Sequence, residues 1–349
     1  MHKDGVVYFP IHGSARGLLV QNNEYSDDEL LFPDGTANWN EQKTKKAQAA
    51  HGVSIIEITK QRGGQWRDLR FSTDAEPNEP NRFGWVVEID PFDPNSTPVK
   101  RTALGRLKHE GAWVQEARDG RVVVYTGDDQ ANEYIYRYVS RLPWRRARRL
   151  GINPLNDGTL YVGKFNADGT GVWLPLTPSN PALAGWGLND ILINTRGAAD
   201  AVGATKMDRP EWIDTFPDSL TAIATLTNNS SRSAATVEAA NPRAPNTYGH
   251  IIRWRYRFDF SEPTFFWDIF ALGGDPENPA HGSTIKGDKF GPLMACTSRP
   301  AVGSGSRPTC PAVRSTRVRM PGLATTRCCA RTRIHARYGA SSLARTSAR

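Results

Sequence analysis

Cysteine is missing from the first 295 residues of this 349-residue chain. All four cysteines lie near the C-terminus, at Cys296, Cys310, Cys328 and Cys329. None of them has the C-x-x-C spacing of a metal site, and the adjacent pair could form a disulfide only with strain. The main part of the chain therefore uses no disulfide, and its composition leaves the redox compartment open.

Long apolar stretches are missing as well. No run approaches the 18 apolar residues that a membrane-spanning helix needs. The first residues, MHKD, do not begin the apolar core of a signal peptide. We therefore expect a chain that does not cross a membrane, and its sequence contains no visible export signal.

Acidic residues and lysine are missing from residues 292–349, which hold 11 of the 44 basic residues, all of them arginine. Residues 1–291 therefore carry 33 basic and 36 acidic side chains, a net charge of −3. The overall charge of +8 comes from the tail, while the main part is mildly acidic. This distribution argues against a nucleic-acid-binding protein.

Phenylalanine and tryptophan are missing after Phe290, so the tail has little to bury. The strand pattern stops near Gly291, where Arg, Ala, Ser, Thr, Pro and Gly take over. We expect residues 292–349 to be a disordered, basic, low-complexity tail behind a folded domain of residues 1–291. A reading-frame shift near Gly291 would explain the abrupt change.

Short runs rich in valine, isoleucine, tyrosine and tryptophan fill the main part, with Gly, Asn, Asp and Pro between them. This pattern predicts an all-β fold, either a sandwich pair, a barrel or a propeller. Strand–turn–strand units of roughly 40 to 50 residues favour an incomplete β-propeller. Residues 166–171 predict a hairpin turn, because Asp-Gly supplies a positive φ. Two stretches, 40–50 and 188–201, look helical. The predicted strands are 6–10, 17–20, 53–59, 83–90, 121–125, 134–139, 159–165, 171–176, 220–227, 250–256 and 265–270.

Two short motifs carry candidate chemistry: KHE at 108–110 and DRPEW at 208–212. In the second, Arg209 and Glu211 flank a proline. A guanidinium pairs phosphate oxygens in a bidentate manner, and a carboxylate beside it can ligate a cation. The pair therefore suits a phosphate held next to a metal ion, although a structural or solvated ion pair is the alternative.

Several strings of the chain, in the same order, resemble the PhoX-type alkaline phosphatases, and together they cover most of residues 6–291. The first group is GLLVQNNEY at 17–25, GRLKHE at 105–110, VVYTGDD at 123–129, EYIY at 133–136 and GTLYV at 158–162. The second group is MDRPEW at 207–212, LTNNS at 226–230, NPRAPNTYGHI at 241–251, FWD at 266–268 and GDP at 274–276.

The resemblance implies a six-bladed β-propeller that hydrolyses phosphomonoesters at a site with calcium and iron. It implies metal-ligating positions at Glu24, Glu110 and Glu211 and a phosphate-contacting position at Arg209. Carboxylates suit hard calcium and ferric ions, which would activate an oxygen nucleophile. It also implies twin-arginine export to the periplasm or the medium, and we expect a monomer without a nucleic-acid or membrane partner.

The chain departs from the family pattern at three places. Asn23 precedes Glu24 where the family has a histidine. Between Arg70 and Phe83 the family carries a long insert with a cysteine that ligates iron, and here the insert is missing. The ligand-bearing segment expected after Phe290 is replaced by the arginine-rich tail. We therefore expect an incomplete site, weak iron binding and low phosphatase activity.

Two other functions stay open at this point. One is a calcium-dependent propeller hydrolase of the lactonase kind, which would tolerate the replacement of Arg209 by alanine. The other is a catalytically inactive propeller remnant, which would hydrolyse no phosphate ester with any metal and would leave strand edges exposed.

Overall fold

The structure is a computed structural model of the chain. It describes residues 81–93, 95–216, 219–286 and 291 with their side chains. Elsewhere it describes the backbone of the strands named below and of residues 79–80, and a few single residues, among them Phe9, Val20, Phe32, Asn40 and Lys43.

The chain divides into two compact units, each taken by itself here. The first comprises residues 1–82, 89–98 and 332–349, and the second 83–88 and 99–331. In the first unit, β1 (His2–Ile11), β2 (Arg16–Tyr25) and β3 (Gly52–Thr59) form an antiparallel sheet in the order β1-β2-β3. The short helix η2 (Glu79–Arg82) ends this part of the chain.

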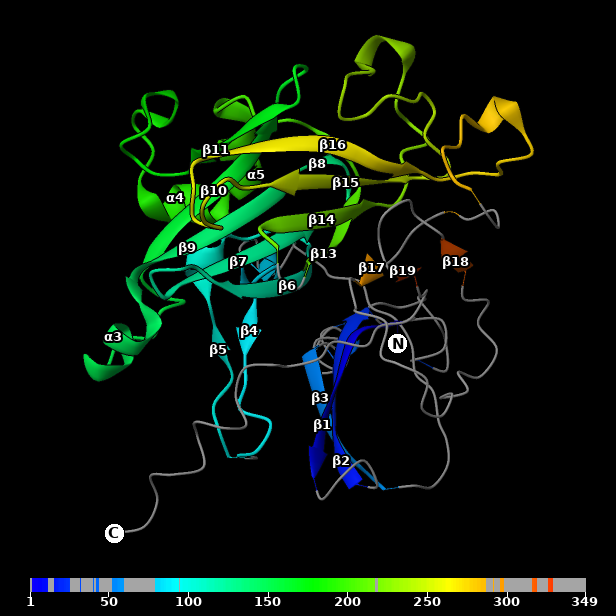
Figure 1. Cartoon of the computed structure of the whole chain (residues 1–349). Helices are drawn as coiled ribbons and strands as arrows, with labels where there is room; N and C mark the ends of the chain where they lie inside the picture. The colour runs from blue at the N-terminus through cyan, green and yellow to red at the C-terminus, as the bar shows by residue number, and fades with distance from the viewer. Residues whose placement is uncertain are drawn as a thin grey trace. The chain divides into compact units, whose positions relative to one another are not determined.

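Most strands of the second unit form one nine-stranded antiparallel sheet, in the order β13-β14-β15-β16-β11-β10-β9-β7-β6 (Figure 1). Two-stranded ladders join β12 to β8 and β4 to β5. The helices are short. The strands are β4 (Val87–Glu88), β5 (Val99–Lys100), β6 (His109–Glu116), β7 (Arg121–Asp128), β8 (Ala131–Glu133), β9 (Ile135–Pro143), β10 (Gly158–Phe165), β11 (Thr170–Pro175), β12 (Met207–Asp208), β13 (Pro210–Thr215), β14 (Thr221–Leu226), β15 (His250–Arg255) and β16 (Thr264–Leu272). The helices are α3 (Trp144–Arg149), α4 (Leu188–Ile193) and α5 (Thr195–Ala201), with 3-10 turns η3 (Thr102–Leu104), η4 (Pro181–Leu183), η5 (Ala234–Thr236) and η6 (Pro279–His281).

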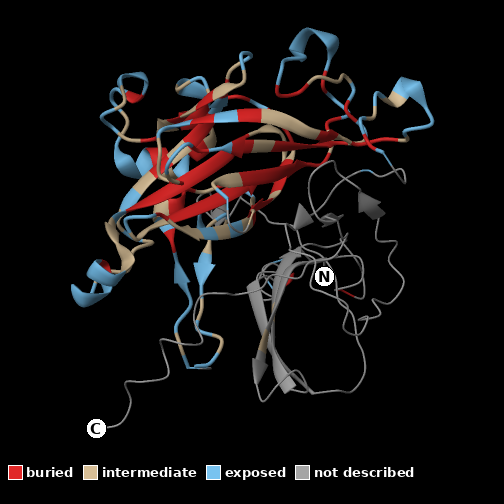
Figure 2. Ribbon diagram, in the orientation of Figure 1, coloured by how far each residue is buried: buried red, intermediate tan, exposed pale blue. Residues whose placement is uncertain are grey.

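The two faces of the sheet bury different side chains, because neighbouring residues of a strand point to opposite faces. Along β7, Val123 and Tyr125 belong to one apolar cluster and Val124 to another. The first cluster joins β7, β9 and β10 with β14, β15 and β16 and contains Trp173 and Trp254, whose ring centroids lie 6.2 Å apart. Buried residues accordingly run along the strands in Figure 2. The sheet thus curls around an aromatic interior.

The opposite face of β7, β9 and β10 is covered by α4 and α5. Ile191 of α4 and Ala198 and Ala199 of α5 pack in the same cluster as Tyr136 and Tyr138 of β9. Asn194 separates the two helices, and its side chain accepts a hydrogen bond from the Gly197 amide. The predicted helical stretch 188–201 is therefore confirmed, as two short helices. Of the other stretch, 40–50, most residues lie outside the described part.

The two edge strands of the sheet, β6 and β13, come together. The Trp113 indole of β6 donates a hydrogen bond to the Thr215 hydroxyl of β13 at 3.0 Å. That hydroxyl donates in turn to the Gln115 side chain at 3.1 Å. Curling has therefore brought the first and last strands side by side, and the described sheet is nearly closed.

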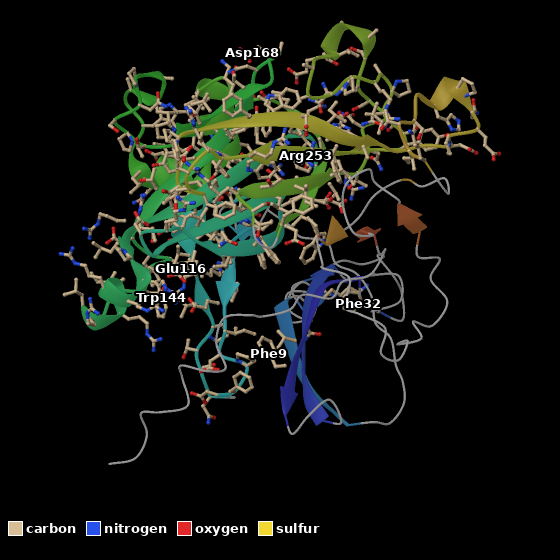
Figure 3. All side chains as sticks on the ribbon, viewed as in Figure 1. Phe9, Phe32, Glu116, Trp144, Asp168 and Arg253 are labelled. Atoms are coloured by element: carbon tan, nitrogen blue, oxygen red, sulfur yellow. The ribbon has the colours of Figure 1, made fainter. Side chains whose placement is uncertain are left out.

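The all-β prediction is confirmed. The predicted hairpin joins β10 to β11, and Asp168 at its tip accepts a hydrogen bond from the Thr170 amide at 2.9 Å (Figure 3). Gly169 takes the expected positive φ of 82°. Among the described residues, the strands of the large sheet are hydrogen-bonded to one another in one continuous order.

The tail contains three short strands, in the order β17-β19-β18. They are β17 (Cys296–Thr297), β18 (Thr316–Val318) and β19 (Thr326–Cys328). The other residues after position 291 lie outside the described part, so the predicted disorder and the domain boundary near 291 stay predictions. Among the described residues, no helix has the length and the apolar content needed to span a membrane.

Candidate functional site

Arg209 and Glu211 lie together between β12 and the start of β13. They flank Pro210, and Arg209 has a positive φ of 58°, so the segment is not a regular strand at this point. The Arg209 guanidinium lies 3.7 Å from the Glu211 carboxylate. The Glu211 side chain is 3% exposed and that of Arg209 36%, so the arginine reaches from a buried carboxylate towards the surface.

Asp129 also contacts Arg209. The Nε and Nη2 atoms of Arg209 donate to the two Asp129 carboxylate oxygens at 2.5 and 3.2 Å, a bidentate pair. Asp129 therefore fixes the orientation of the guanidinium. The Gly-Asp-Asp sequence at 127–129 is typical of a turn and does not indicate this contact. Only the pairing of β8 with β12 shows that Asp129 meets Arg209, 80 positions away.

Glu110 reaches the same place from β6. It lies opposite Gly127 of β7 in the ladder. A Cβ on Gly127 would come within 2.4 Å of the Glu211 carbonyl oxygen, so β7 approaches the backbone of β13 as closely as glycine allows. Glu110 and Glu211 are therefore both neighbours of Gly127, and both are buried. The backbones of Glu110 and Glu211 thus lie at one seam, where β6 and β7 meet β13, and the convergence of Glu110 with Arg209 and Glu211 stays a prediction.

Glu24, the remaining predicted ligand, lies on β2 in the first unit. Its side chain lies outside the described residues, as do residues 60–78, where the family's cysteine-bearing insert is expected. The predicted role of Glu24 therefore stays a prediction.

The donor set at the seam consists of carboxylate oxygens. Such donors fit hard cations of the calcium type and offer no thiolate or imidazole to a softer ion. Within the described ranges, no group of three or more His, Cys, Asp and Glu side chains is close enough to hold a metal ion. Glu110 and Glu211 would thus supply part of a coordination shell, not all of it.

Asp128 has a structural partner instead. Its buried carboxylate accepts hydrogen bonds from Nε and Nη2 of Arg196, at 2.7 Å for Nε. Burial raises the pKa of Asp128, and the arginine partly offsets this effect. Because Arg196 comes from α5, this pair joins the helix that covers the sheet to the end of β7.

His109 precedes Glu110, and both of its ring nitrogens have partners. Its Nε2–H donates to the Gly105 carbonyl at 2.9 Å, and its Nδ1 lies 3.0 Å from the Thr126 hydroxyl. Burial lowers the pKa of His109 to about 4, so the ring is neutral and fully engaged. These bonds give His109 a structural role beside Glu110.

We expect the protein to lose stability between pH 7 and pH 5. Burial lowers the pKa of both His109 and His250 from 6.5 to about 4. Between pH 6.5 and pH 4 these histidines bind protons in the unfolded chain but not in the folded protein. The free energy of unfolding therefore falls as the pH falls. Each histidine contributes at most about 1.4 kcal/mol per pH unit. Urea unfolding at pH 5, 6 and 7 measures this loss.

Glu133 acts in the opposite direction. Burial raises its pKa from 4.5 to about 7, so the folded protein binds the extra proton in this range and gains stability as the pH falls. Glu133 is only half-buried, and its contribution is correspondingly smaller. The variant Glu133→Gln should therefore show a steeper loss than the wild type. A free energy of unfolding that rises on acidification from pH 7 to 5 would contradict the assignment of two neutral buried histidines.

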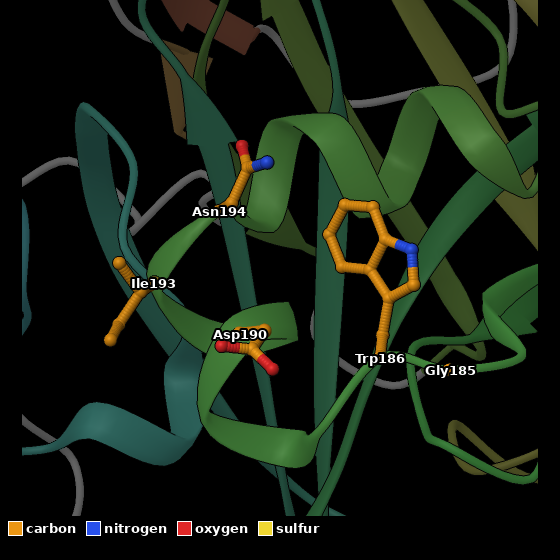
Figure 4. A pocket seen from close by; sticks show the side chains of 5 residues that line it. All are labelled: Gly185, Trp186, Asp190, Ile193 and Asn194. Atoms are coloured by element: carbon orange, nitrogen blue, oxygen red, sulfur yellow. The ribbon is translucent and has the colours of Figure 1, made fainter.

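A shallow hollow lies elsewhere in the second unit, at the start of α4 (Figure 4). It is lined by Trp186, Asp190 and Asn194, with Gly185 and Ile193. The Asp190 carboxylate accepts a hydrogen bond from the Gly187 amide at 3.0 Å, which caps the helix. The lining includes none of the predicted site residues, and its polar groups serve the helix.

The comparisons with known proteins cover most of the chain. The family model of alkaline phosphatase PhoX matches residues 1–74 and 68–292. The two matched segments meet at 68–74, beside the position where the family's insert is expected to be missing. A search of curated proteins found no match.

A solved structure, Pseudomonas fluorescens PhoX in complex with vanadate, a transition state analogue, is similar to this chain at 34% sequence identity. The similarity covers 79% of this chain and 67% of that chain, with a TM-score of 0.67. It supports the predicted incomplete propeller, and neither comparison supports the lactonase alternative. From its sequence, its curled β-sheet and these matches, the chain belongs to the PhoX alkaline phosphatases, a family of metal-dependent phosphoric monoester hydrolases with a propeller-like β fold.

Proposed function

We propose that this chain hydrolyses phosphomonoesters at the seam between β6, β7 and β13, where Arg209 binds the phosphoryl group and Glu110 and Glu211 hold cations. The contact between Arg209 and Glu211, next to Glu110, carries this proposal. A guanidinium beside buried carboxylates provides an anion contact and cation ligands within one small region.

Arg209 is placed to act on the transferring group. Asp129 holds the guanidinium through Nε and Nη2, which fixes the direction from which it can bind a phosphate oxygen. Charge spreads over the non-bridging oxygens during phosphoryl transfer, and a fixed arginine stabilises that charge. Vanadate, which the related Pseudomonas fluorescens structure contains as a transition state analogue, is therefore a suitable probe for this chain.

We assign calcium and iron as the cations, and Glu24 of the first unit stays a predicted ligand. Bound cations would supply a nucleophile from water and neutralise negative charge. The oxygen donors at the seam suit calcium well. They suit iron less, because the first 295 residues contain no cysteine to replace the thiolate that the family uses. We therefore expect weak iron binding and a slower enzyme than a complete family member.

Cation binding at the seam can be tested through stability, independently of turnover. A ligand that binds only the folded state stabilises it by about 2.7 kcal/mol at a concentration of 100 Kd. Calcium should therefore raise the Tm of the wild type, and Glu110→Gln and Glu211→Gln should each reduce this increase by at least half. Calorimetric scans across a calcium titration provide the measurement.

Glu116→Gln is the matched control, because Glu116 lies on the same strand as Glu110 and its carboxylate accepts a hydrogen bond from the Trp144 indole instead (Figure 3). Its calcium response should equal that of the wild type. Equal responses of all three variants would exclude the seam as the calcium site. Turnover of p-nitrophenyl phosphate with calcium and iron present then tests the reaction itself.

We further propose that the protein acts on exposed phosphate esters in the periplasm or outside the cell. We expect it to be a monomer without a nucleic-acid or membrane partner. Fractionation of cells that express the complete gene would test the location.

A further inference from the structure

Arg209 has an unusual backbone conformation. Among the described residues other than glycine, only Asn132 and Arg209 have a positive φ, of 66° and 58°. Both flank one short ladder, in which Asp208 of β12 lies opposite Ala131 of β8. Arg209 also precedes a proline, which restricts the preceding residue to extended conformations. The positive φ of Arg209 therefore costs free energy and persists only where the surroundings enforce it.

Asp208 provides an anchor directly before Arg209. Its side chain is completely buried, and both of its oxygens are bound. One accepts a hydrogen bond from Arg232 Nε at 2.5 Å and the other from Asn246 Nδ2 at 2.9 Å. A carboxylate that is buried and paired in this way cannot move without leaving charges unpaired, so the peptide before Arg209 is fixed.

Arg232 extends this anchor to the backbone. Its two remaining nitrogens donate to the carbonyl oxygens of Thr236 at 2.7 Å and Lys206 at 3.0 Å. The planar guanidinium thus ties β12 to η5 in three directions. A lysine could keep the charge at this position but could not make the three bonds.

Asn246 fixes the other side of Asp208. Its Oδ1 accepts a hydrogen bond from the Gly249 amide at 3.1 Å, and its Nδ2 lies 3.0 Å from His250 Nδ1. His250 Nε2–H donates to the Ala240 carbonyl at 2.8 Å, which leaves Nδ1 as the acceptor. The amide nitrogen of Asn246 therefore donates both of its hydrogens, one to His250 and one to Asp208.

Arg209 itself is held after this anchor. Its carbonyl accepts a hydrogen bond from the Thr227 amide at 3.0 Å, and its side chain meets Asp129. We propose that the buried cluster of Asp208, Arg232 and Asn246 is a positioning device, which holds Arg209 in the left-handed conformation and so aims its guanidinium at the substrate phosphate. This inference rests on the proposed role of Arg209 in binding phosphate.

Asp208→Asn and Arg232→Lys test the cluster in the full chain with calcium and iron present. The readouts are kcat and KM for p-nitrophenyl phosphate and the inhibition constant of orthovanadate, each corrected for the folded fraction measured by circular dichroism. A displacement of about 1 Å at a catalytic group costs on the order of 100-fold. We expect Asp208→Asn to lower kcat/KM about 100-fold and to raise the inhibition constant of orthovanadate about 100-fold. For Arg232→Lys we expect both changes to be about tenfold.

A merely structural cluster would give a different result: the folded fraction would fall, but folded molecules would keep the vanadate constant of the wild type. Asp268→Asn is the matched control. It too disrupts an arginine–carboxylate pair, that of Arg253 with Asp268 of β16, which is bidentate at distances of 2.8 and 2.5 Å. We expect it to leave the vanadate constant unchanged. If Asp208→Asn does not fold, the inhibition constant of orthovanadate for Arg232→Lys decides between a positioning and a merely structural role.

Arg209→Ala separates the two proposals. If it weakens vanadate binding while Asp208→Asn and Arg232→Lys do not, the positioning device is refuted and the proposed function stands. If Arg209→Ala leaves vanadate binding unchanged, or if the wild type binds no vanadate, both proposals fail. Parallel losses in all three variants, without a loss in Asp268→Asn, support both.

Discussion

Replacing Arg209 by alanine should lower kcat/KM for p-nitrophenyl phosphate by about 100- to 1,000-fold, the effect of removing one fixed donor that stabilises transition-state charge. Stability should change little, because the side chain is 36% exposed and its ion pair with Asp129 is half-buried. Steady-state kinetics of both proteins with calcium and iron, at equal folded concentration, measure this loss.

Two further variants show whether charge or geometry matters. Arg209→Lys keeps the charge but not the planar fork, so it should recover only part of the activity. Arg253→Ala is the control, because Arg253 lies on β15 and pairs with Asp268 (Figure 3). It should retain the kcat/KM of the wild type. An Arg209→Ala protein with full phosphatase activity would contradict the role proposed for Arg209, and a lactonase-type hydrolase would show that tolerance.

Most of the local structure could be predicted from the sequence. β-branched and aromatic runs gave the strands, and alternation along β7 and β9 placed neighbouring side chains on opposite faces of the sheet. Asp168-Gly169 gave the hairpin, because its turn depends on two adjacent residues alone. Such features are determined by contacts between near neighbours.

The pairing of distant segments could not be predicted in the same way. β8 and β12 are two of the shorter strands, and nothing in either segment alone indicates that they pair. That ladder brings Asp129 to Arg209, so Asp129 was missed as a neighbour of the candidate site. The closure of the sheet at Trp113 and Thr215 depends in the same way on the cumulative twist of all nine strands.

The candidate site was predicted in part. Arg209 and Glu211 were predicted together as the residues that flank Pro210, and the structure places their side chains 3.7 Å apart. The prediction that Glu110 joins them came from the family resemblance, and the structure adds that its ladder partner Gly127 lies close to the backbone of β13. The anchor formed by Asp208, Arg232 and Asn246 has no sequence signal, because its members come from three separate segments.

Replacing Arg137 by alanine should destabilise the protein by about 3–5 kcal/mol, the largest stability effect that we expect of a single side chain. Arg137 is 1% exposed in the aromatic interior, where its guanidinium lies 4.8 Å from the Trp173 ring and 5.0 Å from the Tyr161 ring. It donates to the carbonyl oxygens of Phe260 and Glu262 at 2.9 and 2.6 Å. Alanine would leave a cavity between the rings and two buried carbonyls without this donor. Urea unfolding measures the cost.

Arg141, on the same strand, provides the control, because its bidentate pair with Asp157 is exposed to solvent. Arg141→Ala should therefore cost far less than Arg137→Ala. Arg137→Met separates packing from hydrogen bonding: it fills most of the volume without a donor, so it should cost less than alanine by the cavity contribution and still more than Arg141→Ala. If Arg137→Ala costs no more than Arg141→Ala, the interior closes around the missing side chain, and the guanidinium does not link β9 to the loop between β15 and β16.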